Sequence, residues 1–466
     1  MTALDAVPGL ASNTAAPASV LLRLLKFDHG WSTVTRLTHR ASLPDEVAKV
    51  LLTHPERRVR GALAESAGAD PALRARLLDG PASDAVLVAC GPQPYGTAAP
   101  PLPDHAYARL LAHDDANVRY EMANAPSTPA HVLLPLATHE DPFFRRAACR
   151  RVWEELAPEV RGALLDDPDP EVRTAAALHV MADDEERTAW LVETRAGLFS
   201  LWEVLARGRL ERGLAERLLA EYLDTDGTRL ARLVGNPTFP ADLAATLAGH
   251  EDPAVRLAVS ARPELTEEQR AAVGWKVTEE DRLEPLVWVW RGRADAELLR
   301  RCARSAHTWL RRSAAVCAEL PDDCVELLAG DEDVAVRLLL AERHPKAPPE
   351  LLLDLYLHGT HRAVGMLTAR PGFPSAGLAE RFADAADPRE RALTLRDPAA
   401  TPELVERLSR DPDGFVRLAA AFDHRLSVNR IVELLDDPEV GFAAAANPLL
   451  PVAEMTALLD RAGVPG

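Results

Sequence analysis

The sequence predicts an all-α protein, an α-α superhelical solenoid of about sixteen two-helix repeats with a period of 24–29 residues. Three observations support this fold class. An aspartate followed four residues later by an arginine recurs along the chain at this spacing. A proline, acidic residues and a leucine-rich run form a second recurring signature. Aromatic residues make up only 5% of the chain, so the interior has to be mostly Leu, Ala and Val, a composition that favours helices.

The Asp-to-Arg motif, usually D-x-x-V-R, sets the period of the repeat. It reads DPEVR from Asp169 and DPAVR from Asp252, and these copies are 83 residues apart, close to three periods. Where neighbouring copies are both intact, as at Arg119 and Arg145, their arginines are 26 residues apart. The motif therefore predicts one continuous array of similar repeats.

Each repeat is expected to contain two short helices. The first starts at a proline and acidic residues, as in TPELVERLSR from Thr401, where proline suits the first turn and acidic side chains complement the helix dipole. The second starts at the motif aspartate, a favoured N-cap, often followed by proline as at Asp252 and Pro253. Neither helix could bury its apolar face alone, so stacking supplies a core that Val255 is expected to face.

The pattern D-P-x-V-R-x-x-[LAV]-A-x-[NR]-P, followed by T-P or L-P and a leucine run, resembles the leucine-rich repeat variant family and, more broadly, HEAT-like α-solenoids. The resemblance covers roughly residues 30–460 and implies an α-solenoid fold. Proteins of these families are scaffolds for many roles, so it implies no particular reaction. Some leucine-rich repeat variant proteins carry an N-terminal cysteine cluster for an iron–sulfur centre. No cysteine precedes Cys90 here, so that centre is not expected.

The repeats divide the chain into a short lead and one long array. Residues 1–30 are expected to form an N-terminal tail and a capping helix, and residues 31–466 a single α-solenoid. The proline-rich stretch at 91–104 predicts an inserted surface loop. Near 183–225 and 265–310 the spacing persists while the motif degenerates, and six of the eight tryptophans lie in these two regions.

Charge and targeting signals limit the possible partners. A net charge of −18 opposes non-specific binding to nucleic acid or to an anionic membrane surface. The five cysteines are scattered, which disfavours a disulfide framework, and the first residues lack the pattern of a signal peptide. No uncharged run approaches the length of a membrane helix. We therefore expect a soluble, acidic, cytoplasmic protein with a protein partner; its oligomeric state does not follow from the sequence.

The chain offers no motif for catalysis. No GxxxxGK[ST], GxGxxG, GxSxG or HExxH pattern occurs, so we expect no catalytic residues, no cofactor and no metal. The repeated arginines could form an anion-binding ladder. Their presence in repeat after repeat is better explained by stacking, with each arginine pairing with its own motif aspartate or with that of an adjacent repeat.

The tryptophan-rich middle is the candidate partner site. It contains Trp275, Trp288, Trp290 and Trp309 with Arg291 and Arg311 nearby. Tryptophan and arginine dominate interface hot spots, yet the same tryptophans could fill a wider core where the repeats are irregular. Because Trp288 and Trp290 are two residues apart, they cannot share one helix face, so one should be buried and the other more exposed.

Two functions stay open. The first is a non-catalytic protein–protein interaction scaffold that uses the concave surface of the solenoid. The alternative is a HEAT-like DNA glycosylase or another nucleic-acid-acting enzyme, supported by the tryptophans and arginines and opposed by the net charge.

Overall fold

The computed structural model describes residues 5–26, 30–40, 42–66, 68–92, 100–194, 198–359 and 362–466. The chain divides into two compact units, which are described separately. Unit 1 comprises Met1–Ala157 and Ser375–Gly466, and unit 2 comprises Pro158–Pro374. The single array expected over residues 31–466 stays a prediction; one of the two units contains both ends of the chain. Of the predicted loop at 91–104, residues 93–99 lie outside the described residues.

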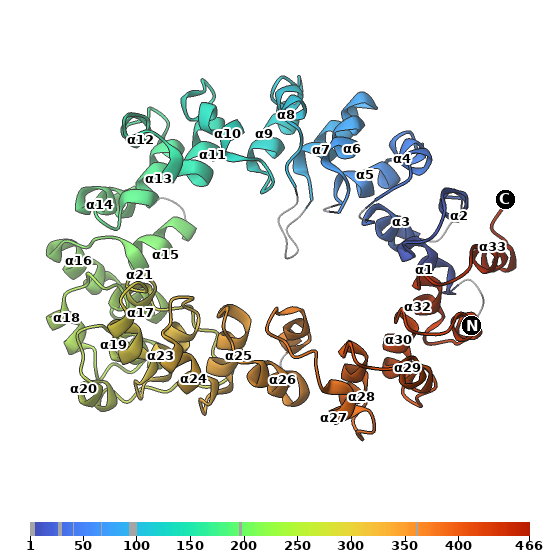
Figure 1. Ribbon diagram of the computed structural model, residues 1–466. Helices are drawn as coiled ribbons and strands as arrows, with labels where there is room; N and C mark the ends of the chain where they lie inside the picture. Colours follow the sequence, from blue (N-terminus) through green and yellow to red (C-terminus); the bar gives the residue numbers. More distant parts are fainter. Residues whose placement is uncertain are drawn as a thin grey trace. The chain divides into compact units, whose positions relative to one another are not determined.

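Over these ranges the chain is helical and contains no strand (Figure 1). The helices of unit 1 are α1 (Val7–Ser12), α2 (Ala18–Leu24), α3 (Gly30–Thr38), α4 (Asp45–Leu52), α5 (Arg57–Ala64), α6 (Pro71–Ala75), α7 (Ala85–Cys90), α8 (Asp104–Leu111), α9 (Ala116–Asn124), α10 (Ala130–Leu133), α11 (Pro142–Val152), α27 (Leu378–Phe382), α28 (Pro388–Leu393), α29 (Pro402–Leu408), α30 (Gly414–Ala421), α31 (Val428–Leu434), α32 (Gly441–Ala446) and α33 (Val452–Arg461).

The helices of unit 2 are α12 (Pro158–Leu165), α13 (Pro170–Val180), α14 (Glu185–Glu193), α15 (Leu198–Arg207), α16 (Arg212–Tyr222), α17 (Gly227–Val234), α18 (Ala241–Thr246), α19 (Pro253–Ser260), α20 (Glu267–Ala272), α21 (Val287–Arg291), α22 (Ala296–Ala303), α23 (Thr308–Ala315), α24 (Asp322–Ala329), α25 (Val334–Arg343) and α26 (Pro349–His358). Short 3₁₀ segments occur at η2 (Arg76–Asp79), η3 (Ala82–Asp84), η4 (Leu134–Thr138), η5 (Trp153–Glu155), η6 (Arg362–Ala369) and η7 (Thr394–Arg396). No helix of the described ranges is long and apolar enough to cross a membrane.

Alternate helices stack in rows within each unit. In unit 1, α5, α7, α9 and α11 pack in succession, as do α28, α30 and α32; in unit 2, α13, α15, α17 and α19 do the same. The D-x-x-V-R motif was expected to start α9, α11, α13, α19, α28 and α30, whereas α7 and α15 carry no copy of it. Asp252 caps α19 by accepting a hydrogen bond from the Ala254 amide at 2.8 Å, and Pro253 takes the first helical position. Val255 is fully buried, as predicted.

The motif arginines point into the stack. Arg256 donates to the carbonyl oxygens of His250 and Glu251, at 2.6 and 2.8 Å, in the turn before its own helix. Arg391 makes the equivalent bonds and also pairs with Asp411 of the next repeat at 2.7 Å. The sequence predicted pairing with the motif aspartate of the same or an adjacent repeat. The observed partner, Asp411, lies two residues before the next motif aspartate, Asp413, and the carbonyl contacts were not predicted. The ladder thus satisfies backbone groups that the turns leave open.

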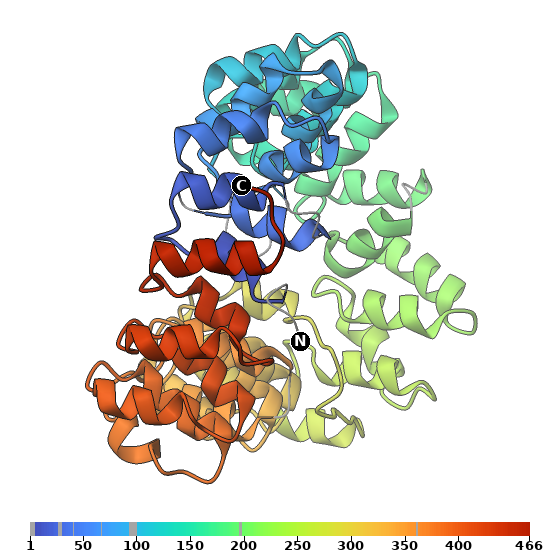
Figure 2. The ribbon, with the colours of Figure 1, turned by 90° about the vertical axis from the view of Figure 1, so that its right-hand side faces the viewer.

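The first helices of the chain continue the row formed by the last ones (Figure 2). Within unit 1, α1 packs on α32 on one side and on α3 on the other, while α2 packs on α33 and α4. Arg23 forms an ion pair with Asp460 at 2.7 Å. We expected a tail before a capping helix in residues 1–30; residues 5–26 instead form part of the stack, and residues 1–4 and 27–29 lie outside the described residues. We call this junction the chain-end seam.

Buried asparagines cross the chain-end seam in register. The Asn447 amide donates to the carbonyl oxygens of Ala421 and Asp423, one repeat earlier, at 2.8 and 3.0 Å. Asn13 does the same one step further on, donating to Ala445 and Asn447 at 2.9 and 2.7 Å. Both asparagine side chains are fully buried. The same turn-to-turn contact therefore passes from the end of the sequence to its beginning.

Candidate binding groove in unit 2

The most irregular segment of unit 2 runs between α20 and α21. Residues 274–286, which we call the strap, contain no helix, whereas the neighbouring repeats are helical. The local sequence explains the break: Gly274 has a positive φ of 69°, a conformation that favours glycine, and Pro285 stands just before α21. Between them, KVTEEDRLE lacks the helical spacing of apolar residues found in the leucine-rich runs.

Side chains of α23 hold the strap through its backbone. The Trp309 indole N–H donates to the Glu284 carbonyl at 2.8 Å, and the Ser313 hydroxyl accepts the Leu286 amide at 3.0 Å. Arg312 donates to the carbonyl oxygens of Thr278 and Asp281, both at 2.9 Å. The strap thus gains the partners that a helix would have supplied internally.

Arg312 also ties the strap to α25. Its guanidinium is 3% exposed and pairs with the Asp333 carboxylate at 2.8 Å, and that carboxylate caps α25 by accepting the Val336 amide at 2.9 Å. Burial raises the pKa of Asp333, but the hydrogen bonds from Arg312 and Val336 outweigh it and hold the pKa below its ordinary value. One buried ion pair therefore joins the strap, α23 and α25.

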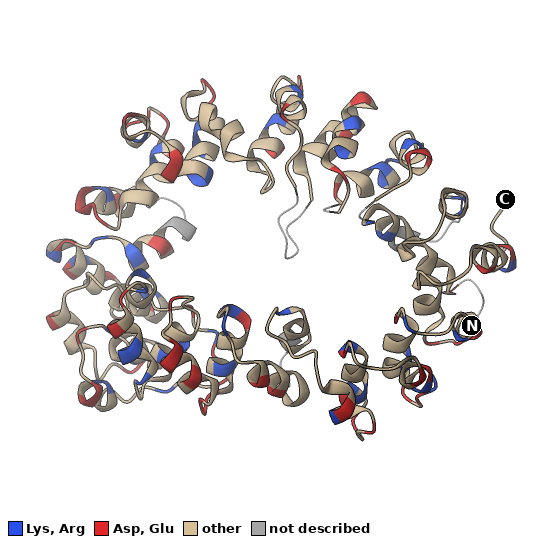
Figure 3. Cartoon of the chain, in the orientation of Figure 1, with Lys and Arg blue, Asp and Glu red and all other residues tan. Residues whose placement is uncertain are grey.

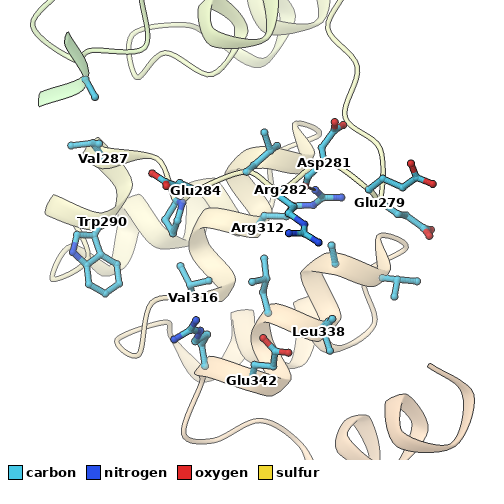
Figure 4. Close-up of a pocket in the computed structure, with 18 of the residues that line it drawn as sticks. Glu279, Asp281, Arg282, Glu284, Val287, Trp290, Arg312, Val316, Leu338 and Glu342 are labelled. Atoms are coloured by element: carbon cyan, nitrogen blue, oxygen red, sulfur yellow. Dashed lines mark hydrogen bonds between the residues drawn. The ribbon is translucent and has the colours of Figure 1, made fainter. Parts of the chain in front are cut away.

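Beside the strap lies a groove of about 1420 Å³ (Figure 4). In this view Val287 and Trp290 lie at one end, Glu279 and Asp281 at the other, with Val316 and Leu338 between them. Its larger apolar lining residues are Leu283, Val287, Trp290, Val316, Val334, Leu338, Leu339, Leu355 and Val364. Its charged lining residues are Glu203, Arg207, Arg232, Glu279, Glu280, Asp281, Arg282, Glu284, Arg291, Arg312, Glu342 and Arg343. We call this cavity the unit 2 groove.

Trp290 and Arg291, two of the six predicted partner-site residues, line the unit 2 groove. The Trp290 side chain is 46% exposed, and the Arg293 guanidinium lies 4.9 Å from the centre of its ring. Trp288 is half-buried and its indole donates to the Ala261 carbonyl at 3.1 Å. The expected contrast between Trp288 and Trp290 is therefore present.

The other three predicted residues make contacts inside unit 2. The Trp275 ring stacks on His307 with centroids 4.0 Å apart, and Trp309 anchors the strap as described. Arg311 is buried and bonded to Asp331 at 2.7 Å and to the Ser305 carbonyl at 3.1 Å. The structure therefore does not gather all six residues into one exposed patch. The residues that line the groove do not include Trp275, Trp288, Trp309 or Arg311.

Sequence reasoning missed the strap carboxylates and the part of α25 that lines the unit 2 groove. Leu338 and Glu342 belong to a regular repeat, so nothing in the motif separates them from residues that only stack. Glu279 and Glu280 were counted with a degenerate repeat. The signal that could have found them is the run from Gly274 to Pro285, which has no apolar period and is rich in acidic residues.

A serine and a histidine meet beneath the strap without forming a catalytic pair. The Ser260 hydroxyl lies 2.9 Å from Nε2 of His307, and both residues are fully buried. His307 Nδ1 accepts the Trp309 amide at 3.2 Å, so the proton of the neutral ring is on Nε2. Ser260 in turn donates to the Leu257 carbonyl at 2.8 Å. Since Nε2 donates to the hydroxyl, His307 cannot accept its proton as a general base.

The buried thiols of this region are not activated either. Burial raises the pKa of Cys302 to about 12 and that of Cys317 to about 11, so neither supplies a thiolate near neutral pH. In the described residues no group of three or more His, Cys, Asp or Glu side chains is placed to hold a metal ion.

His307 gives unit 2 a specific pH dependence. Burial, then the charges of Arg270 and Arg311, lower the pKa of His307 from 6.5 to about 3. In the unfolded chain the ring takes up a proton below pH ~6.5, but the folded chain resists this until pH ~3, so stability falls as the pH falls through this window. We expect His307→Asn, which keeps an N-cap acceptor, to remove up to ~1.4 kcal/mol per pH unit from the slope.

Urea unfolding of both proteins between pH 4 and pH 7 measures that slope. Carboxylates contribute to acid denaturation in both proteins, so the difference between the two slopes isolates His307. Identical slopes would show that His307 takes up its proton as readily in the folded chain as in the unfolded one.

The fold and the groove define a helical-repeat protein with an open cavity on one of its two units. Neither the known family models nor the curated proteins contain a match to this chain. Among solved structures it is similar to the karyopherin Kap121p, in a crystal structure with the extreme C-terminus of the protein phosphatase Cdc14p. The sequences are 12% identical, the TM-score is 0.16, and the match covers 95% of this chain and 51% of the karyopherin chain. This chain thus spans about half the length of that one, and no function follows from so distant a likeness.

Proposed function

We propose that this protein is a non-catalytic interaction scaffold of the HEAT-like α-solenoid class that holds an extended segment of a partner protein in the unit 2 groove. The single observation that carries the proposal is the groove itself, an open cavity of about 1420 Å³ with an exposed tryptophan at one end. Pockets for small ligands are smaller, roughly 300–1,000 Å³. A cavity of this size, apolar between charged borders, suits several side chains of one peptide segment.

The lining offers few groups for a reaction. Of the described residues around the unit 2 groove, none is a histidine, cysteine, serine or lysine, so the six carboxylates are its side chains that could act as a base or nucleophile. The alternative, a nucleic-acid-acting enzyme, has less support. The motif arginines that suggested it donate to backbone carbonyls and aspartates of their own stack, and Figure 3 shows acidic and basic residues interspersed along the helices of each unit.

Trp290→Ala is expected to weaken partner binding about tenfold or more while leaving the melting temperature unchanged, because nearly half of this side chain is exposed and available to a partner. The measurement uses a displayed library of random peptides selected on the full chain, followed by titration of the retained peptides. Phe422→Ala is a matched control, since Phe422 is 47% exposed and lies in unit 1. Equal loss of binding in both variants, or a library from which no peptide is retained, would count against a site in the groove.

A further inference from the structure

The unit 2 groove is strongly acidic along one border. The strap segment Glu279–Glu280–Asp281–Arg282–Leu283–Glu284 contains four carboxylates and one guanidinium, and every one of these residues lines the groove. Glu279, Glu280 and Glu284 are exposed, and the Glu284 side chain is 80% accessible. Carboxylates gathered on an exposed segment repel one another unless a cation lies nearby.

Most of these carboxylates have no strong cationic partner within the described residues. The Asp281 carboxylate accepts hydrogen bonds from the amide and the hydroxyl of Thr278, at 2.6 and 2.9 Å. Glu284 lies 3.8 Å from Arg232. No described residue forms an ion pair with Glu279 or Glu280. Arg312, the buried cation beneath the strap, is committed to Asp333 and to backbone carbonyls, so it does not neutralise them.

The opposite end of the groove has a different character. Figure 4 places Val287 and Trp290 there, away from Glu279 and Asp281, with Val316 and Leu338 between the two ends. Among the basic lining residues, Arg207 pairs with Glu203 at 3.1 Å. The groove therefore has an aromatic and aliphatic end, beside which Glu284 also lies, and an end with Glu279 and Asp281, beside which Arg282 lies. Both ends are lined by the same unit.

We infer that the partner segment carries lysine or arginine at one end and bulky apolar side chains at the other. The inference rests on the proposed function and adds the chemistry of the ligand. The cationic side chains lie against Glu279 and Glu280, and the apolar ones against Trp290, Val316 and Leu338. A basic segment is attracted to a chain of net charge −18, which also speeds its association at low salt. An acidic segment or a phosphate backbone would be repelled by the same border.

The experiment uses a displayed library of random twelve-residue peptides on the full chain, with sequencing of the retained pool. The expected result is enrichment of lysine or arginine beside leucine or aromatic residues. A retained peptide, labelled with fluorescein, should bind Glu279→Gln/Glu280→Gln about threefold to tenfold more weakly than the wild type at low salt, because exposed ion pairs each contribute little. The difference should shrink in 0.5 M salt, roughly where screening becomes strong.

A matched double variant, Glu326→Gln/Asp354→Asn, changes the net charge by the same amount at exposed positions of unit 2 outside the groove, and it should bind as the wild type does. Neutral or acidic peptides whose binding depends on Trp290 but not on Glu279 and Glu280 would overturn this inference and leave the scaffold function standing. Peptides that bind Trp290→Ala as tightly as the wild type, or a library that yields no binder, would overturn both.

Discussion

Arg312→Ala is expected to lower the free energy of unfolding by about 3–5 kcal/mol, the largest effect of any single side chain beside the groove. The guanidinium is 3% exposed and makes two bonds to strap carbonyls and an ion pair with Asp333. Its removal leaves the Thr278 and Asp281 carbonyls without their donor and Asp333 without its counter-ion. The measurement is urea unfolding, together with hydrogen exchange of strap amides.

Arg282→Ala is the matched control for this experiment. Arg282 belongs to the same strap and is exposed, so its loss should change stability by no more than ~0.5 kcal/mol. Hydrogen exchange should accelerate over residues 274–286 in Arg312→Ala and stay unchanged in Arg282→Ala. If Arg312→Ala melted like the wild type with a protected strap, the ion pair would not be what holds this segment.

Gly9→Ala is expected to open the chain-end seam. A β-carbon at Gly9 would lie 2.1 Å from the Phe442 carbonyl oxygen and 2.9 Å from the β-carbon of Ala445, so α1 could not keep its position on α32. Overpacking of this kind costs about 1–3 kcal/mol, and more where the obstacle is backbone. Hydrogen exchange should rise in both α1 and α32, which are more than 400 residues apart in sequence, while unit 2 keeps its protection.

Gly162→Ala provides the comparison for Gly9→Ala. No heavy atom lies within 4 Å of the position of an added β-carbon at Gly162, which is in the interior of α12. Because alanine favours helix more than glycine does, this variant should be more stable by about 0.5–1 kcal/mol. Gly9→Ala with unchanged exchange at both ends of the chain would mean that the seam is not closed in solution.

The parts of the fold that could be predicted are those encoded within a few residues of sequence. The N-cap of Asp252, the proline after it and the burial of Val255 all follow from local rules, and they agree with the structure. The contrast between Trp288 and Trp290 also follows from helix geometry alone. These features depend on residues adjacent in the sequence and not on which helices pack against each other.

The parts that could not be predicted depend on partners distant in sequence. The strap is held by Trp309 and Arg312, 25 to 34 residues away, so the sequence could not decide whether the tryptophans of this region are core or binding residues. Trp309 proved to be an anchor and Trp290 a groove residue, which spacing alone could not distinguish. Asn13 contacts residues 432 and 434 positions away, a distance at which no repeat pattern applies.

The chain-end seam has a consequence for biosynthesis. Val7, Leu10 and Ala11 are fully buried, in a helix that packs on α32 at the far end of the sequence. Translation at about 5–20 residues per second leaves tens of seconds between the emergence of these two segments from the ribosome. During that time the side of α1 that will face α32 stays in contact with solvent or with chaperones. Nascent chains should therefore leave this helix uncovered for as long as the residues between it and α32 take to be translated.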